Sequence, residues 1–191
     1  MSEQSESGLD KLPVVDSSVH GVTAYAGGYL ATLLLFLVFE GERFIGDVVE
    51  GAGWLFYNAQ FVPVEQRASL AGPVVEDLAS INYLTGQGLD AAATSSVVVP
   101  AVVYHAIPVV AYVVAGAALV QSAGVQTPRT GAKLGASMVL GTIILAVGGT
   151  FIFEAAGQIG PNRLYGVLLV GVAYPGICGA IGGVLGVTVD A

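Results

Sequence analysis

Four long stretches of the sequence contain no Asp, Glu, Lys or Arg, and this feature constrains the fold more than any other. They cover residues 17–39, 91–128, 134–153 and 164–189. About 20 apolar residues in an α-helix cross the ~30 Å hydrocarbon layer of a bilayer. Because no water reaches the backbone there, each spanning segment must pair its own amide and carbonyl groups as a helix. The sequence therefore predicts an all-α membrane protein, a bundle of four transmembrane helices.

The boundaries of the predicted spans follow from the polar segments that separate them. A polar tail, residues 1–18, is expected to be disordered. The four spans are expected at residues 19–39, 97–122, 133–153 and 164–187. The apolar part of the first span is too long for a typical signal peptide, and an acidic sequence follows it. We therefore interpret it as a retained anchor, with cleavage as the alternative.

The composition excludes several classes of protein. Only 10% of the residues are charged and the mean hydropathy is +0.78, whereas soluble domains carry about 25% charged residues. The net charge of −8 repels phosphates, so we expect no nucleic-acid partner. Cys178, the single cysteine, excludes an intramolecular disulfide and a cysteine-based zinc site. Because catalytic and cofactor motifs are also missing, we expect no enzyme, cofactor or metal.

The connection between the first two spans, residues 40–96, is long and acidic. It holds eight of the 14 acidic residues and, with 57 residues, is too long for a bare loop. Apolar residues within 42–56 repeat with a helical period, which predicts an amphipathic helix at the membrane surface or over the bundle. Trp54 and Tyr57 leave this apolar face, as rings at headgroup level would.

Two further interpretations of this connection remain open. The amphipathic segment is alternatively an extension of the first span, bent at Gly41. A second short helix is predicted over residues 74–83, where apolar residues share one face and Gly86 and Gly88 follow.

The positive charges predict the orientation of the bundle. With four spans, both termini lie on one side, together with Lys11, Arg129 and Lys133. Arg43 and Arg163 flank spans on the other side. The positive-inside rule therefore places the termini in the cytoplasm and the acidic connection outside the cell membrane.

Two short motifs, Pro13–Asp16 before the first span and Gly53–Ala59, give the chain a family resemblance. It resembles small haloarchaeal membrane proteins of unassigned function, some of which carry only a general transporter label. The resemblance implies a four-span layout and a halophilic archaeal source, but no particular functional residue. The acid excess is also typical of proteins that remain soluble in strong salt.

His105 is the most informative residue for function. It lies inside the second span, beside Tyr104 and between Pro100 and Pro108. An ionisable group at that depth is costly and faces the bundle or water, while the prolines kink the helix. An inward His in a kinked helix binds a substrate, relays protons or gates a path. The alternative is a neutral His that bonds to a neighbouring helix.

Tyr174 and Pro175 mark a second break, in the fourth span. If this break faces His105 and Pro108 near the middle of the membrane, the two broken helices form the kind of site that transporters use.

Glu40 and Glu154 end the first and third spans within similar short sequences, residues 38–41 and 152–155. An internal repeat with parallel spans would place both carboxylates on the outer face. We predict a cation-attracting vestibule there, with Arg163 as a partner of either acid. The alternatives are chance similarity and ordinary solvation at the interface.

Small residues recur inside the first and fourth spans at four-residue spacing. This pattern lets helix backbones approach closely, within one bundle or between copies, and a glycine-lined path is the alternative. The residues are Ala24, Gly28, Gly179, Gly182, Gly183 and Gly186.

The leading functional hypothesis is a small transporter, channel or transporter accessory subunit. Its site is predicted around His105, Tyr104, Pro108, Tyr174 and Pro175. The alternative is a non-catalytic scaffold that binds other membrane proteins. The expected partners are the lipid bilayer and either further copies of the chain or other membrane proteins.

Overall fold

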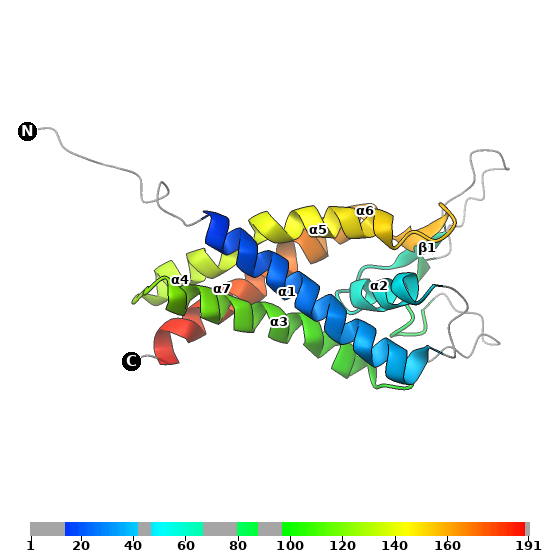
Figure 1. Cartoon of the computed structure of the whole chain (residues 1–191), viewed down its shortest axis with the longest axis horizontal. Helices are drawn as coiled ribbons and strands as arrows, with labels where there is room; N and C mark the ends of the chain where they lie inside the picture. The colour runs from blue at the N-terminus through cyan, green and yellow to red at the C-terminus, as the bar shows by residue number, and fades with distance from the viewer. Residues whose placement is uncertain (1–13, 42–46, 67–79, 88–96, 190–191) are drawn as a thin grey trace, which may run out of the picture.

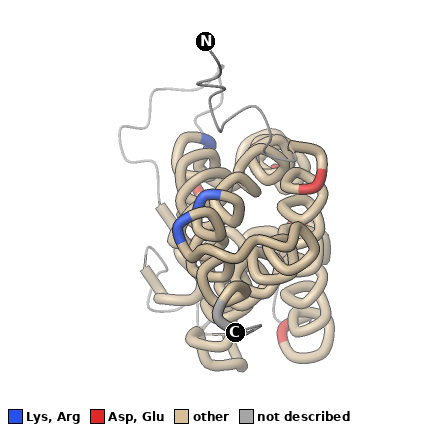
Figure 2. The backbone as a smooth tube through the Cα atoms, turned by 90° about the vertical axis from the view of Figure 1, so that its left-hand side faces the viewer, with Lys and Arg blue, Asp and Glu red and all other residues tan. Residues whose placement is uncertain are grey.

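Four long apolar helical rods pack together in the computed structural model, which describes residues 14–41, 47–66, 80–87 and 97–189 (Figure 1). The predicted fold class is confirmed, since the structure is mostly helical and the connection between the first two rods is partly helical. The first rod begins, and the last rod ends, at the same end of the bundle. Figure 2 looks along the bundle from that end and shows how few charges the described helices carry.

Three of the four rods change helix type or break along their length. Their elements are α1 (Val14–Leu35) with the π-helix η1 (Phe36–Glu40), α3 (Ala101–Ser122), α4 (Pro128–Ala136) with α5 (Val139–Ile152), and α6 (Arg163–Tyr165) with the π-helix η2 (Gly166–Ala173) and α7 (Tyr174–Val189). The first rod begins at Val14, so residues 14–18 of the predicted tail are helical and the rest of that tail lies outside the described residues. The second rod begins at Ala101 rather than at residue 97.

A small antiparallel sheet joins the two connections at the far end of the bundle. Its strands are β1 (Val64–Gln66), β2 (Ser80–Ile81) and β3 (Ile159–Pro161), in the order β2-β1-β3. Val64 pairs with Ile81 on one side and with Pro161 on the other. The end of the predicted helix over 74–83 is therefore strand β2, and residues 74–79 lie outside the described part.

The helix predicted in the long connection exists as α2 (Val48–Asn58), and most of it is buried against the rods. Residues 51–60 are all buried. Trp54 is 8% exposed and Tyr57 is fully buried, so both rings are packed inside the protein and do not lie on its surface. Residues 42–46 of the predicted segment lie outside the described residues.

The burial of α2 has a physical reason that the apolar periodicity does not contain. Its second face carries small glycines and rings that can donate hydrogen bonds. The Phe153 ring covers Gly53 so closely that a Cβ would overlap it. Trp54 Nε1 donates to the Phe153 carbonyl (2.8 Å), and the Tyr57 hydroxyl donates to the Ala146 carbonyl (2.6 Å). Such a face can be buried when carbonyl groups accept the hydrogen bonds of its Trp and Tyr side chains.

The glycines of α7 hold this helix against α3 and α4. A Cβ at Gly182 would overlap the Val113 carbonyl of α3, and one at Gly183 would overlap the Gly131 carbonyl of α4. Gly179 meets the backbone of Gly135 in the same way. The predicted small-residue pattern in the fourth span therefore brings backbones together within one chain.

The remaining small residues of the pattern also face neighbours inside the chain. A Cβ at Gly186 would lie 2.7 Å from the Ala117 carbonyl. In the first rod, Ala24 is buried, and a Cβ at Gly28 would lie 3.1 Å from the Phe56 ring.

A pair of glycine substitutions tests this packing, because the two changes are expected to act in opposite directions. Gly182→Ala places a methyl group against the Val113 carbonyl and is expected to lower the free energy of unfolding by about 1–3 kcal/mol. Gly27→Ala places one in open space and is expected to raise it by up to about 1 kcal/mol through helix propensity. Unfolding by denaturing detergent measures both, and equal effects would contradict the packing.

Candidate functional site

The carboxyl end of α2 lies inside the bundle, so its last carbonyl groups need donors from the protein. The turn that follows supplies some of them. Phe61 N–H donates to the Asn58 carbonyl (2.9 Å), and Val62 N–H donates to the Tyr57 carbonyl (3.0 Å). The Gln60 side-chain amide donates to the Phe56 carbonyl (3.2 Å). The last carbonyl groups of α2 are therefore buried and accept hydrogen bonds from the protein.

The Ala59 carbonyl, one residue beyond α2, receives side chains from two different rods. His105 Nδ1 of α3 lies 2.7 Å from this oxygen, and the Tyr174 hydroxyl of α7 donates to it over 3.4 Å. The Phe61 ring stacks on the His105 ring, with 4.8 Å between centroids. The structure thus brings His105 and Tyr174 to one atom, an atom contributed by neither span.

Proline accompanies both of these side chains. Pro108 is buried in α3 and has no N–H to donate to Tyr104, four residues earlier. Pro175 lies at the start of α7, directly after η2. The Tyr174 N–H donates to the Leu169 carbonyl five residues back, which is the π-helical spacing.

Glu40 does not line an open vestibule, because it is fully buried. Its carboxylate accepts hydrogen bonds from the Val98 N–H (2.8 Å) and the Val99 N–H (3.1 Å), just before α3. The Tyr104 hydroxyl donates to it as well (3.3 Å). Glu40 thus joins the end of the first rod to the start of the second, and Tyr104 contacts Glu40 rather than the Ala59 carbonyl.

Glu154 and Arg163 contact each other at the same end of the bundle. Arg163 Nη2 lies 2.9 Å from Glu154 Oε2, and the guanidinium group lies 4.4 Å from the centre of the Phe151 ring. Arg163 is half exposed. The structure therefore pairs Glu154 with Arg163, as one of the predicted alternatives required, and gives Glu40 different partners.

A pair of tyrosines extends the buried polar groups toward the middle of the bundle, and the sequence analysis did not identify it. The Tyr57 hydroxyl donates to the Ala146 carbonyl of α5, so Tyr25 of α1 donates to Tyr57 (3.1 Å). Desolvation by burial raises the pKa of Tyr57, which keeps its hydroxyl neutral. Tyr57 lies in the Gly53–Ala59 motif, which was the available signal.

The half of the bundle nearest the termini is closed by apolar side chains. Leu119, Leu134 and Met138 form a buried cluster there. The glycine contacts of α7 with α4 lie in the same region. The polar groups around α2 therefore lie in one half of the bundle, and the half nearest the termini is packed with apolar side chains.

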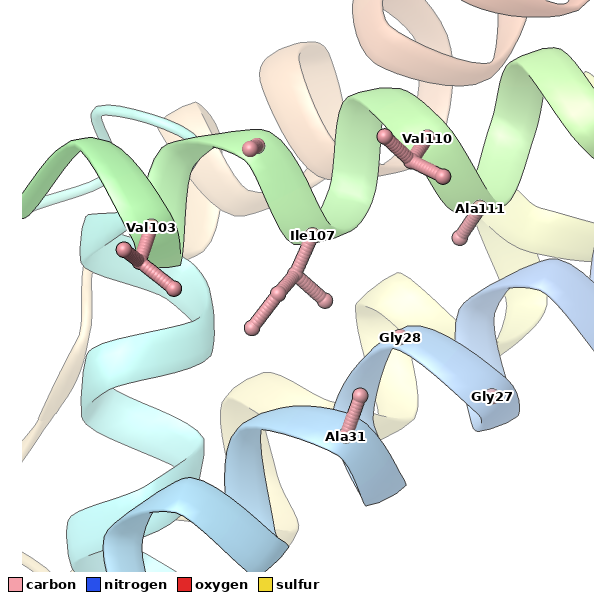
Figure 3. A pocket seen from close by; sticks show the side chains of 8 residues that line it. Gly27, Gly28, Ala31, Val103, Ile107, Val110 and Ala111 are labelled. Carbon is pink, nitrogen blue, oxygen red and sulfur yellow. The ribbon is translucent and has the colours of Figure 1, made fainter. Parts of the chain in front are cut away.

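An apolar groove lies between α1 and α3 (Figure 3). Its volume is about 390 Å³. Small and aliphatic residues line it: Gly27, Gly28, Ala31, Val103, Ala106, Ile107, Val110 and Ala111. Its lining is apolar, unlike the polar side chains around the Ala59 carbonyl. Within the described part of the chain, no group of three or more His, Cys, Asp or Glu is placed to hold a metal ion.

Comparison with known proteins identifies a family for the chain but no activity. A family model described as "Family of unknown function (DUF7978)" matches residues 1–190. No curated protein and no solved structure matches the chain.

Replacement of Glu40 tests the buried carboxylate. In Glu40→Gln, the amide oxygen can replace Oε1, which accepts from both the Val98 and Val99 N–H groups. The amide nitrogen then replaces Oε2 and faces the Val98 N–H, another donor. Because this contact and the charge are lost, the free energy of unfolding is expected to fall by about 1–3 kcal/mol. Arg163→Gln removes a half-exposed ion pair and is expected to cost less than about 1 kcal/mol. Detergent unfolding compares the two variants, and a Glu40→Gln protein as stable as the parent would contradict the assignment.

Proposed function

Because the chain belongs to the family of unknown function DUF7978, we propose its function from its site alone. The chain is a multi-span membrane protein. We propose that it is a transport-related protein of the cell membrane: a small transporter, a channel or a transporter accessory subunit. Its site is the buried end of α2 with His105 and Tyr174.

One observation carries this proposal. Two spans, one with Pro108 inside a continuous helix and one that changes from π-helix to α-helix just before Pro175, direct His105 and Tyr174 to the carbonyl that follows a helix which does not cross the bundle. Irregular backbone at membrane depth is tolerated only where protein buries it or where it lines a water-filled cavity. Transporters build their substrate sites from such interrupted helices, whose free carbonyl ends coordinate the transported species.

A scaffold that binds other membrane proteins is the second candidate. The apolar groove between α1 and α3 supports it, because small residues there leave room for an apolar partner. The two candidates differ in what a substitution at His105 does. A scaffold needs this side chain for folding alone, whereas a transporter needs it for flux.

Flux through purified protein in lipid vesicles tests the leading proposal. Vesicles report proton entry with an internal dye, and uptake of radioactive rubidium, chloride and glycine covers other small solutes. At least one flux is expected above that of protein-free vesicles. His105→Phe is expected to reduce it at least tenfold, because the ring stays aromatic but loses the hydrogen bond with the Ala59 carbonyl.

Two further variants separate transport from folding. His105→Asn keeps a side-chain N–H near the Nδ1 position, so the protein is expected to fold while flux still falls. Tyr165→Phe, at an exposed position of α6, is the matched control and is expected to leave flux unchanged. A folded His105→Asn protein with full flux would remove His105 from the site.

We also infer that the termini lie in the cytoplasm. Arg129 and Lys133 lie at the end of the bundle that carries the termini, and Arg163 lies at the other end. This asymmetry and the positive-inside rule support the orientation.

Labelling of single cysteines in intact cells tests this orientation. Gln126→Cys, in the exposed turn after α3, is expected to resist a membrane-impermeant maleimide until the cells are opened. Gln158→Cys, exposed before β3, is expected to react at once. Cys178 is 8% exposed and provides the background. The reverse pattern would place the termini outside.

We also infer that the chain comes from a halophilic archaeon. The acid excess and the resemblance at Pro13–Asp16 and Gly53–Ala59 support a halophilic archaeon.

A further inference from the structure

Two basic side chains lie one helical turn apart at the start of the third rod. Arg129 and Lys133 are both exposed on α4, and like charges at this spacing repel each other. Within the described residues, no ion pair joins either of them to Asp16, the acid in the first turn of α1 at the same end. By contrast, Arg163 at the other end is paired with Glu154. The exposed face of α4 therefore carries two positive charges that no described carboxylate neutralises.

The face that carries this pair continues as an apolar face along α5. The two residues that join α4 to α5 keep right-handed helical dihedral angles, so Leu140 and Ile144 lie two and three turns beyond Lys133 on the same side of the rod. They are 47% and 72% exposed. The opposite face of α4, with Gly131 and Gly135, packs on α7. In a chain that spans a bilayer, this outer face is therefore a lipid-facing surface with a basic end and an apolar length.

The length of this rod places the basic pair at the level of the lipid headgroups. The rod runs from Pro128 to Ile152, which is 25 residues, or ~37 Å at the rise of an α-helix. The hydrocarbon layer is only ~30 Å thick. With Ile152 at one edge of that layer, about five residues at the start of α4 extend beyond the other edge. The long side chain of Lys133 reaches the same level from just inside.

We propose that the outer face of α4 and α5 binds an anionic phospholipid. Its phosphate contacts Arg129 and Lys133, and one acyl chain lies along Leu140 and Ile144. The charges are complementary, since a guanidinium group binds phosphate through two hydrogen bonds and an ammonium group binds it as a point charge. A zwitterionic headgroup fits less well, because its own ammonium group opposes the basic pair. This site goes beyond the proposed transport function and shares no residue with the site at the end of α2.

Native mass spectrometry of the full chain in a mild detergent measures this preference. The protein is mixed with equal amounts of phosphatidylglycerol and phosphatidylcholine that carry the same acyl chains. A basic residue near anionic lipid favours binding about fivefold, so the pair is expected to favour phosphatidylglycerol about 25-fold as the first bound lipid. Arg129→Gln and Lys133→Gln are each expected to lower the ratio about fivefold, and the double variant is expected to bind both lipids equally.

Arg163→Gln is the matched control for these variants. It changes the net charge of the protein by the same amount, but it removes a cation that Glu154 already neutralises. The ratio of the two lipids is therefore expected to stay at the value of the parent protein. A preference that survives the double substitution of Arg129 and Lys133, or that falls equally in Arg163→Gln, would overturn the proposal.

Soluble glycerol phosphate distinguishes a lipid site from a site for free phosphate. It carries the anionic group of the lipid but has no acyl chain to lie along Leu140 and Ile144. A large excess is therefore expected to leave the bound phosphatidylglycerol in place. Displacement of the lipid by glycerol phosphate would show that the basic pair binds any phosphate and would overturn the lipid assignment.

Brominated acyl chains test where the chain of the lipid lies, because bromine quenches the fluorescence of a nearby Trp ring. Leu140→Trp and Leu168→Trp place a ring at two similarly exposed positions, in α5 and in η2. After subtraction of the parent signal, brominated phosphatidylglycerol is expected to quench the ring of Leu140→Trp at least twofold more than brominated phosphatidylcholine at the same fraction in vesicles. The two lipids are expected to quench Leu168→Trp equally. Equal quenching at both positions would overturn the placement of the lipid on α5.

Discussion

The structure depends on one constraint: a helix that ends inside a membrane bundle must find donors for its last carbonyl groups. α2 meets this constraint with its own turn, with the Gln60 amide, and with His105 and Tyr174 at the Ala59 carbonyl. Each of these bonds replaces a bond to water that lipid cannot provide. The polar side chains around α2 are therefore required by its buried end, and the same side chains form the proposed site.

Two spans also depart from a regular α-helix near α2. Pro108 cannot donate to the Tyr104 carbonyl, and η2 ends at Tyr174, whose hydroxyl donates to the Ala59 carbonyl. In the other half no such insertion exists among the described elements, and glycines bring α7 directly against α3 and α4. One chain thus combines side-chain hydrogen bonds around α2 with backbone-to-backbone contacts of α7.

The sequence predicted the parts of this structure that depend on lipid. Charge-free stretches predict four spans because a bilayer demands long apolar helices. The burial of α2 was not predictable in the same way, since Gly53, Trp54 and Tyr57 are buried only because Phe153 and Ala146 lie opposite them. His105 and Tyr174 were identified because they are polar groups in apolar spans. Their common partner is a backbone carbonyl, which every residue has, so the sequence does not indicate which residue provides it.

Trp54, the single tryptophan of the chain, offers the most direct measurement of the central claim that α2 lies inside the bundle. Its fluorescence in lipid vesicles reports the surroundings of the ring without any substitution. The structure buries the ring, stacks it on Tyr83 and bonds its nitrogen to the Phe153 carbonyl. We expect short-wavelength emission that neither aqueous iodide nor brominated lipid quenches strongly. Strong quenching by either agent would place α2 at the membrane surface and contradict the account.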